Sequence, residues 1–191
     1  MGNIITDLKD LAYAWKYRAE SKLSARGDVW VDHKRNGRII ESAYEGENTF
    51  TTEGMTAILD IIFRGQTTYS AVYCGLFKGN VTPTLTDTAA AALGSGGRLT
   101  ECLDADYDDP ATNRPAYTIA TAAASACTNA ASKAEFTMAG TVTVYGAFLA
   151  TSQAKTATTG VLACAKRFAT AKVCESGDQL AVSYQITLST A

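Results

Sequence analysis

After residue 66, the chain is a series of short apolar stretches that are rich in β-branched and aromatic residues and separated by turn-forming residues. This pattern is typical of β-strands. We therefore predict a mainly β fold, an antiparallel β-sandwich or jelly roll. The expected strands are 69–77, 116–123, 133–139, 141–150, 160–168 and 179–189.

The N-terminal segment has a different period. Apolar residues of 4–24 recur at three- and four-residue steps, which predicts an amphipathic helix that ends near Gly27. Its apolar stripe is narrow, and Leu8, Leu11 and Trp15 form the centre of a seam that could contact another subunit. Packing on its own domain and use as an inter-subunit arm are both open.

Two further elements are expected before the strands. Asn36-Gly37 favours a tight turn, which predicts a β-hairpin over 29–42. Residues 50–65 predict a second helix, capped by Thr51 or Thr52, closed by Gly65, and packed into the core by its wide apolar face. We accordingly expect an N-terminal helix and hairpin arm for assembly (1–47) and a β-sandwich domain (48–191).

The charge distribution limits the classes of partner. The net charge is −2 and the pI is near 5.4, so no basic field is present to hold nucleic acid or an anionic membrane. No apolar run approaches the ~20 residues that a membrane span requires. Residues 110–165 carry only Arg114, Lys133, Glu135 and Lys155 as charges, so we expect neighbouring subunits to cover much of this Thr- and Ala-rich surface.

The acidic stretch 101–109 is the segment that most resembles a site. Asp104, Asp106 and Asp108 begin like a calcium loop, but the Gly and Glu that such a loop requires are replaced by Asp109 and Pro115. A different calcium site, an exposed acidic turn and a glycan contact through Tyr107 remain alternatives. We treat these four residues (Asp104, Asp106, Tyr107 and Asp108) as a weak calcium or glycan candidate.

Other catalytic and metal-binding patterns are not found in the sequence. The single histidine, His33, has no neighbouring ligand in the sequence, and we expect it to be solvated. The five cysteines lack zinc-type spacing; Cys74 and Cys164 are expected as reduced core thiols, with a disulfide between some pair as the alternative. We expect no enzymatic activity, no catalytic or metal site and no cofactor.

The order of several motifs resembles that of small virion proteins of tailed bacteriophages. The motifs are "ENTFTTEGMTAILDIIF", "YCGLFKGN", "LTDTAA", "RPAY", "FTMAGTVTVYGAFLA", "GVLACAKRF" and "SGDQLAVSYQITLS". The resemblance covers about residues 48–190, and it depends on the order of the motifs, since each motif alone is common.

This resemblance implies a non-enzymatic β-sandwich building block of a phage particle, for example a capsid decoration, neck or collar protein. The implied partners are further copies of the chain, with a trimer as one candidate symmetry, and other virion structural proteins. The implied location is the virion, assembled in the host cytoplasm. A tail-fibre or tail-tip receptor-binding module is the alternative.

Overall fold

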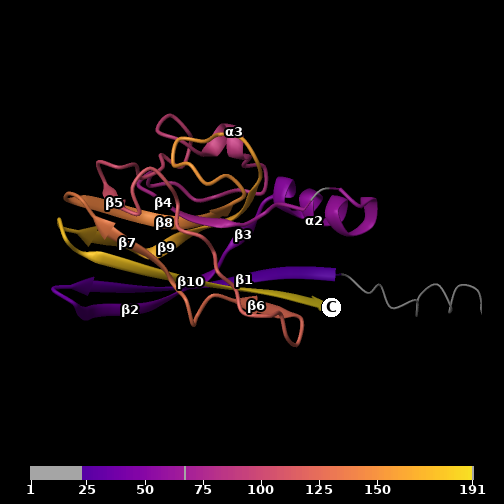
Figure 1. Cartoon of the computed structure of the whole chain (residues 1–191), viewed down its shortest axis with the longest axis horizontal. Coiled ribbons are helices and arrows are strands. Elements are labelled where there is room, and N and C mark those ends of the chain that lie inside the picture. Colours follow the sequence, from indigo (N-terminus) through magenta and orange to yellow (C-terminus); the bar gives the residue numbers. More distant parts are fainter. Residues whose placement is uncertain (1–22, 67, 191) are drawn as a thin grey trace, which may run out of the picture.

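The computed structural model describes residues 23–66 and 68–190 and is mainly β, with two antiparallel sheets (Figure 1). The first sheet has the order β2-β1-β10-β7-β5, with β6 also paired to β10. Its strands are β1 (Leu23–Arg35), β2 (Arg38–Glu47), β5 (Tyr107–Asp109), β6 (Ala126–Thr128), β7 (Ala134–Met138) and β10 (Gln179–Thr190). The second sheet has the order β3-β9-β8-β4. Its strands are β3 (Thr49–Phe50), β4 (Tyr73–Phe77), β8 (Val142–Ala150) and β9 (Leu162–Cys174).

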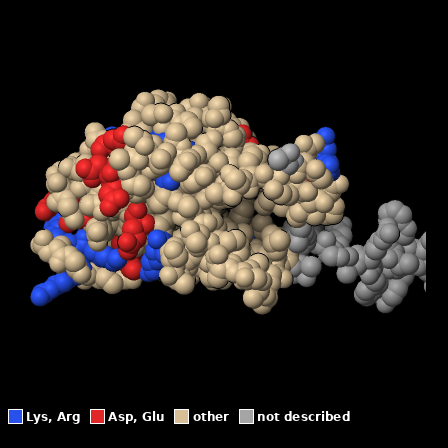
Figure 2. Space-filling model, in the orientation of Figure 1, with Lys and Arg blue, Asp and Glu red and all other residues tan. Residues whose placement is uncertain are grey.

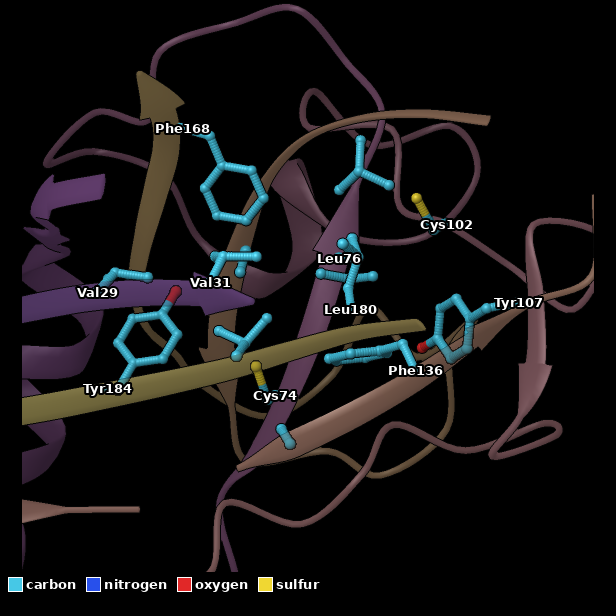
Figure 3. Close-up of a cluster of buried hydrophobic side chains, with 14 of the residues drawn as sticks. Val29, Val31, Cys74, Leu76, Cys102, Tyr107, Phe136, Phe168, Leu180 and Tyr184 are labelled. Atoms are coloured by element: carbon cyan, nitrogen blue, oxygen red, sulfur yellow. The ribbon is translucent and has the colours of Figure 1, made fainter. Parts of the chain in front are cut away.

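The main core lies between the two sheets. Because side chains alternate along a strand, Val29 and Val31 of β1 point inward together with Val182 and Tyr184 of β10. From the second sheet, β4 contributes Leu76, and Figure 3 shows Val29, Val31, Leu76 and Tyr184 in one cluster. Both sheets therefore share one buried apolar layer, an arrangement that is consistent with a sandwich.

A second core covers the other face of the second sheet. The short helix α3 (Ala89–Ala92) places Ala89 and Ala92 against Phe77 and Phe148. The loop 87–101, which is rich in Ala and Gly, thus packs closely on a sheet, and small side chains allow that close approach.

The hairpin formed by β1 and β2 confirms the prediction from Asn36-Gly37, since both turn residues have positive φ (51° and 73°). The hairpin is an integral part of the first sheet, because β1 pairs with β10 from Leu23 to Lys34. The arm that we expected over 1–47 therefore does not include the hairpin.

The predicted end of the N-terminal helix is wrong, because the residues from Leu23 onward belong to β1. Gly27 is not a helix cap but a strand residue with no room for a side chain: an added Cβ would lie 2.3 Å from the amide of Asn48. The remainder of the predicted helix, including Leu8, Leu11 and Trp15, lies outside the described residues.

The second helix, α2 (Thr52–Arg64), has the predicted caps. The Thr51 side chain accepts a hydrogen bond from the Gly54 backbone, and Gly65 adopts the left-handed conformation with φ 63°. The prediction that its apolar face is core is wrong, because most of that face is exposed. None of the described helices is long and apolar enough to cross a membrane.

The strand predicted at 116–123 is also wrong. Ala116 forms an isolated bridge with Tyr73 of the second sheet, whereas the Ala120 N–H bonds to Thr128 of the first. The segment passes from one sheet to the other, so no single neighbour gives it a continuous ladder.

Candidate functional site

A fully buried ion pair anchors the loops at one end of the molecule. Arg114 Nε donates to Glu101 Oε1 at 2.7 Å, and Arg114 Nη2 donates to Glu101 Oε2 at 2.8 Å. The same guanidinium donates to the carbonyls of Ser152 and Ala157, which follow β8. Glu101 also accepts from the Gly94 N–H at 3.0 Å. With every oxygen and most donors satisfied inside the protein, this pair fixes loop positions and leaves no group for a substrate.

The acidic candidate loop does not form a common site. Asp104 Oδ1 accepts from Lys155 Nζ at 2.8 Å, whereas the carboxylate of Asp106 accepts from Lys78 Nζ at 2.7 and 2.9 Å. Each of these carboxylates thus already has its own cation, and Asp108 lies on the surface. The Lys155 ammonium is the main cause that holds the pKa of Asp104 below its usual value.

Tyr107, the aromatic residue of that loop, is a core residue. It is completely buried, and its ring meets Phe136 edge to face with centroids 5.1 Å apart (Figure 3). The glycan role predicted for Tyr107 is therefore wrong, because strand β5 turns this side chain inward. The calcium candidate made of Asp104, Asp106 and Asp108 is likewise not assembled in the structure.

Among the described residues, one group of three potential metal ligands is drawn together: His33, Cys174 and Asp178, with ligand atoms within 4.8 Å of one another. His33 Nε2 lies 2.9 Å from Asp178 Oδ2, and Arg35 donates to both oxygens of Asp178 at 2.9 and 2.7 Å. The prediction that His33 is solvated is wrong, because its side chain is buried and contacts Asp178 of the β9–β10 turn.

Two features make this group a poor metal site. The Arg35 guanidinium binds both oxygens of the Asp178 carboxylate, and it holds the pKa of Asp178 well below its usual range. Burial raises the pKa of the Cys174 thiol to about 12, so it remains protonated. A thiolate is the form that binds a metal. The group instead ties the end of β1 to the β9–β10 turn.

The five cysteines are all free, and Cys74 and Cys164 are fully buried, as predicted. Burial in the apolar core raises the pKa of both thiols far above neutral pH. These two cysteines act as small core residues.

Helix α2 carries an exposed apolar strip. Its four residues are Met55 (38% exposed), Leu59 (50%), Ile62 (62%) and Phe63 (76%). We call these four residues the α2 seam. A groove of about 510 Å³ runs along a different side of the helix; Thr56, Asp60, Tyr69 and residues 85–88 line it, and none of the seam residues does.

The other side of α2 explains why this face turns outward. Gly54 packs so closely on β9 that an added Cβ would lie 2.3 Å from the Ala163 carbonyl oxygen. Glu53 of the same turn accepts from the Ala89 and Leu162 N–H groups at 2.8 and 2.7 Å. The first turn thus fixes the rotation of the helix, and the seam faces away from the sheet.

A second feature lies on the outer face of the first sheet. Trp30 and Tyr44 are cross-strand neighbours with ring centroids 5.3 Å apart. Together with Arg26, Asp28 and Gln185 they line an open hollow of about 500 Å³. Asp28 accepts from the Arg26 guanidinium at 2.9 Å and from the Tyr44 hydroxyl at 2.5 Å. The hollow thus combines aromatic rings with hydrogen-bonding groups.

Sequence reasoning missed both features. Trp30 could have been found, because the flanking Val29 and Val31 alternate with it and point the other way. The side of α2 that faces the sheet could not be predicted from the sequence, since apolar residues lie on both sides of the helix. Comparison with protein families, with curated proteins and with solved structures finds no match for this chain.

Proposed function

We propose that the protein is a non-enzymatic structural protein of a tailed-phage particle that forms homo-oligomers and docks on neighbouring virion proteins, as a capsid decoration, neck or collar component. In this proposal the two sheets form a β-sandwich. The single observation that carries the proposal is the α2 seam, an apolar strip left exposed beside two well-packed cores.

The energetics of the seam favour a protein partner. Burying a side chain such as Leu or Phe completely contributes ~1.5–3 kcal/mol, so covering the exposed parts of these four side chains contributes on the order of 5 kcal/mol. Contiguous exposed apolar strips of this kind mark interaction surfaces in soluble proteins.

The distribution of charge points the same way. In Figure 2, most Lys, Arg, Asp and Glu side chains gather at the end of the molecule opposite to α2, whereas the visible surface towards α2 has few charges apart from basic atoms at the tip of the helix. Charged surfaces resist association, so the sparsely charged end is the better one for permanent contacts. The motif order that resembles phage virion proteins supports the same class of function.

The test is a pair of matched variants in the phage that encodes the chain. Ile62→Glu and Val173→Glu each place a charge on an equally exposed position (62% and 61%), but only Ile62 is in the seam. We expect Ile62→Glu to lower incorporation of the chain into particles at least tenfold, which corresponds to about 1.4 kcal/mol. Val173→Glu should leave incorporation unchanged. Equal incorporation of both variants would contradict an assembly role for the seam.

The second candidate function is a tail-fibre or tail-tip module that binds a receptor glycan. The hollow around Trp30 and Tyr44 favours it, because aromatic faces pack on the C–H faces of sugars and the flanking polar groups accept and donate hydrogen bonds.

A further inference from the structure

We propose that the α2 seam is the docking site for residues 4–19 of a second copy of this chain, so that neighbouring subunits exchange their N-terminal segments. This inference rests on the homo-oligomer of the proposed function and names the contact that would form it. It requires a seam of suitable shape, a segment that matches it, and a reason for exchange between copies.

The seam has the spacing of a helix-pairing surface. Met55, Leu59, Ile62 and Phe63 are separated by four, three and one residues, which aligns them along one side of α2. Because Gly54 and Glu53 fix the opposite side on β9, the helix cannot rotate to bury the seam against its own sheet. A partner must therefore come from elsewhere.

The segment that precedes β1 has the matching pattern. Leu8, Leu11 and Trp15 are separated by three and four residues and form an apolar stripe about as narrow as the seam. The 16 residues 4–19 would measure about 24 Å as a helix, against about 20 Å for the 13 residues of α2. Two such stripes can cover each other along their full length.

Exchange between copies follows from the sequence that joins the segment to β1. Residues 11–26 contain no Gly, Pro, Asn or Asp, and Ser21 and Ser24 are the turn-forming residues in this stretch. β1 already begins at Leu23, so a segment folding back on its own α2 would have to reverse within the few residues after Ala19. In the proposed exchange, the segment instead continues away from β1 and reaches α2 of a neighbouring copy.

The positions of the elements make the exchange reciprocal. Figure 1 shows the beginning of β1 and helix α2 at the same end of the molecule. A second copy that meets this end can receive the segment on its α2 while its own segment reaches the first copy. Such mutual exchange gives a closed, symmetric assembly in which every seam is covered.

The experiment uses a photo-activated benzophenone amino acid in place of Phe63 of the purified full-length protein. Copies carrying the probe are mixed with copies that lack it and are heavy-isotope labelled, then dissociated and reassembled before illumination. Mass spectrometry identifies the crosslinked peptide and its isotope. We expect a peptide from residues 4–19 that carries the heavy isotope.

Two controls set the specificity. The same probe at Val173, which is as exposed as Ile62 but lies outside the seam, should not capture this peptide. Joint replacement of Leu8, Leu11 and Trp15 by Ser should lower the crosslink yield at least tenfold. Replacement of Lys9 and Lys16 by Ser, off the apolar stripe, should leave the yield unchanged.

Three results would overturn the inference: crosslinks to residues 4–19 of the same copy only, crosslinks to another part of the chain, or no crosslink. The particle test separates this inference from the proposed function. If Ile62→Glu is lost from particles but the crosslinks form to another part of the chain, the inference fails and the proposed function stands. If the crosslinks form as expected but the chain is absent from particles, the proposed function fails and the inference stands.

Discussion

Arg114 and Glu101 form a single ion pair inside the protein through two parallel hydrogen bonds, with both donor–acceptor distances below 3 Å and both side chains fully buried. The pair joins the loop after α3 to the segment after β8, because Arg114 also donates to the carbonyls of Ser152 and Ala157. Two long loops, which could be taken for binding loops, are thus held as parts of a rigid body.

Glu101→Gln should destabilise the protein by about 3–5 kcal/mol, since Arg114 would remain buried without a counter-charge. Urea unfolding measures this free energy. The control is Glu135→Gln, which removes an exposed pair with Lys34 and should cost at most about 1 kcal/mol. Equal losses for the two variants would contradict the anchoring role.

Stability should fall in acid through Asp178. Arg35, with the Glu175 N–H and His33, lowers the pKa of Asp178 in the folded protein. The ionised carboxylate therefore stabilises the fold above the unfolded pKa of ~3.9, and this contribution is lost as the pH falls through the folded pKa. Asp178→Asn should cost about 3 kcal/mol at pH 7 and show a shallower decline below about pH 5. Urea midpoints measured at a series of pH values would reveal it, and parallel curves for both proteins would refute it.

Gly54→Ala should destabilise the protein, although the same change in an exposed helix stabilises it by about 1 kcal/mol. The new methyl group would meet the Ala163 carbonyl oxygen and Cα at 2.3 and 2.7 Å, and such overpacking costs about 1–3 kcal/mol. Thermal melting compares this variant with Thr56→Ala, an exposed position of the same helix. A stabilised Gly54→Ala protein would show that α2 does not pack closely on β9.

Calcium at millimolar concentration should not change the melting temperature. Asp104 and Asp106 are already paired with Lys155 and Lys78, and their carboxylates do not converge on one point. A ligand that binds only the native state raises the melting temperature, and the increase grows with the logarithm of the ligand concentration above the dissociation constant. Such a concentration-dependent increase with calcium, absent with magnesium, would show that the acidic loop rearranges into a site.

If the protein binds a receptor glycan, Trp30→Ala should weaken binding about five- to thirtyfold, because an aromatic stacking contact contributes about 1–2 kcal/mol. Binding would be measured on a glycan array and then by calorimetry with the best ligand. Tyr69→Ala, an exposed aromatic residue outside the hollow, is the control. Equal effects of the two variants would exclude the hollow as the binding site.

Local signals in the sequence were sufficient for some elements and not for others. Asn36-Gly37 identifies its hairpin, and Thr51 with Gly65 identifies the ends of α2, because turns and caps depend on a few adjacent residues. The contact of His33 with Asp178 joins residues 145 positions apart, and no local pattern reports it.

The side of a helix that faces the core is also a property of the whole fold. The apolar pattern of α2 predicts a buried face, but the close contact of Gly54 with Ala163 places that face outside. In the same way, acidic residues around Tyr107 interrupt the alternation of apolar and polar residues that marks a strand. The inward direction of the Tyr107 side chain follows only from the pairing of β5 with β7. The surfaces most relevant to function are those where tertiary contacts override the local pattern.

The most direct measurement of the central claim is quantitative mass spectrometry of purified phage particles from the source of the chain, with copies counted relative to the major shell protein. A structural role predicts a fixed stoichiometry. Copies on the order of hundreds would identify a capsid decoration protein, and about three to eighteen would identify a component of a neck or tail ring. Absence of the chain from particles would contradict the account.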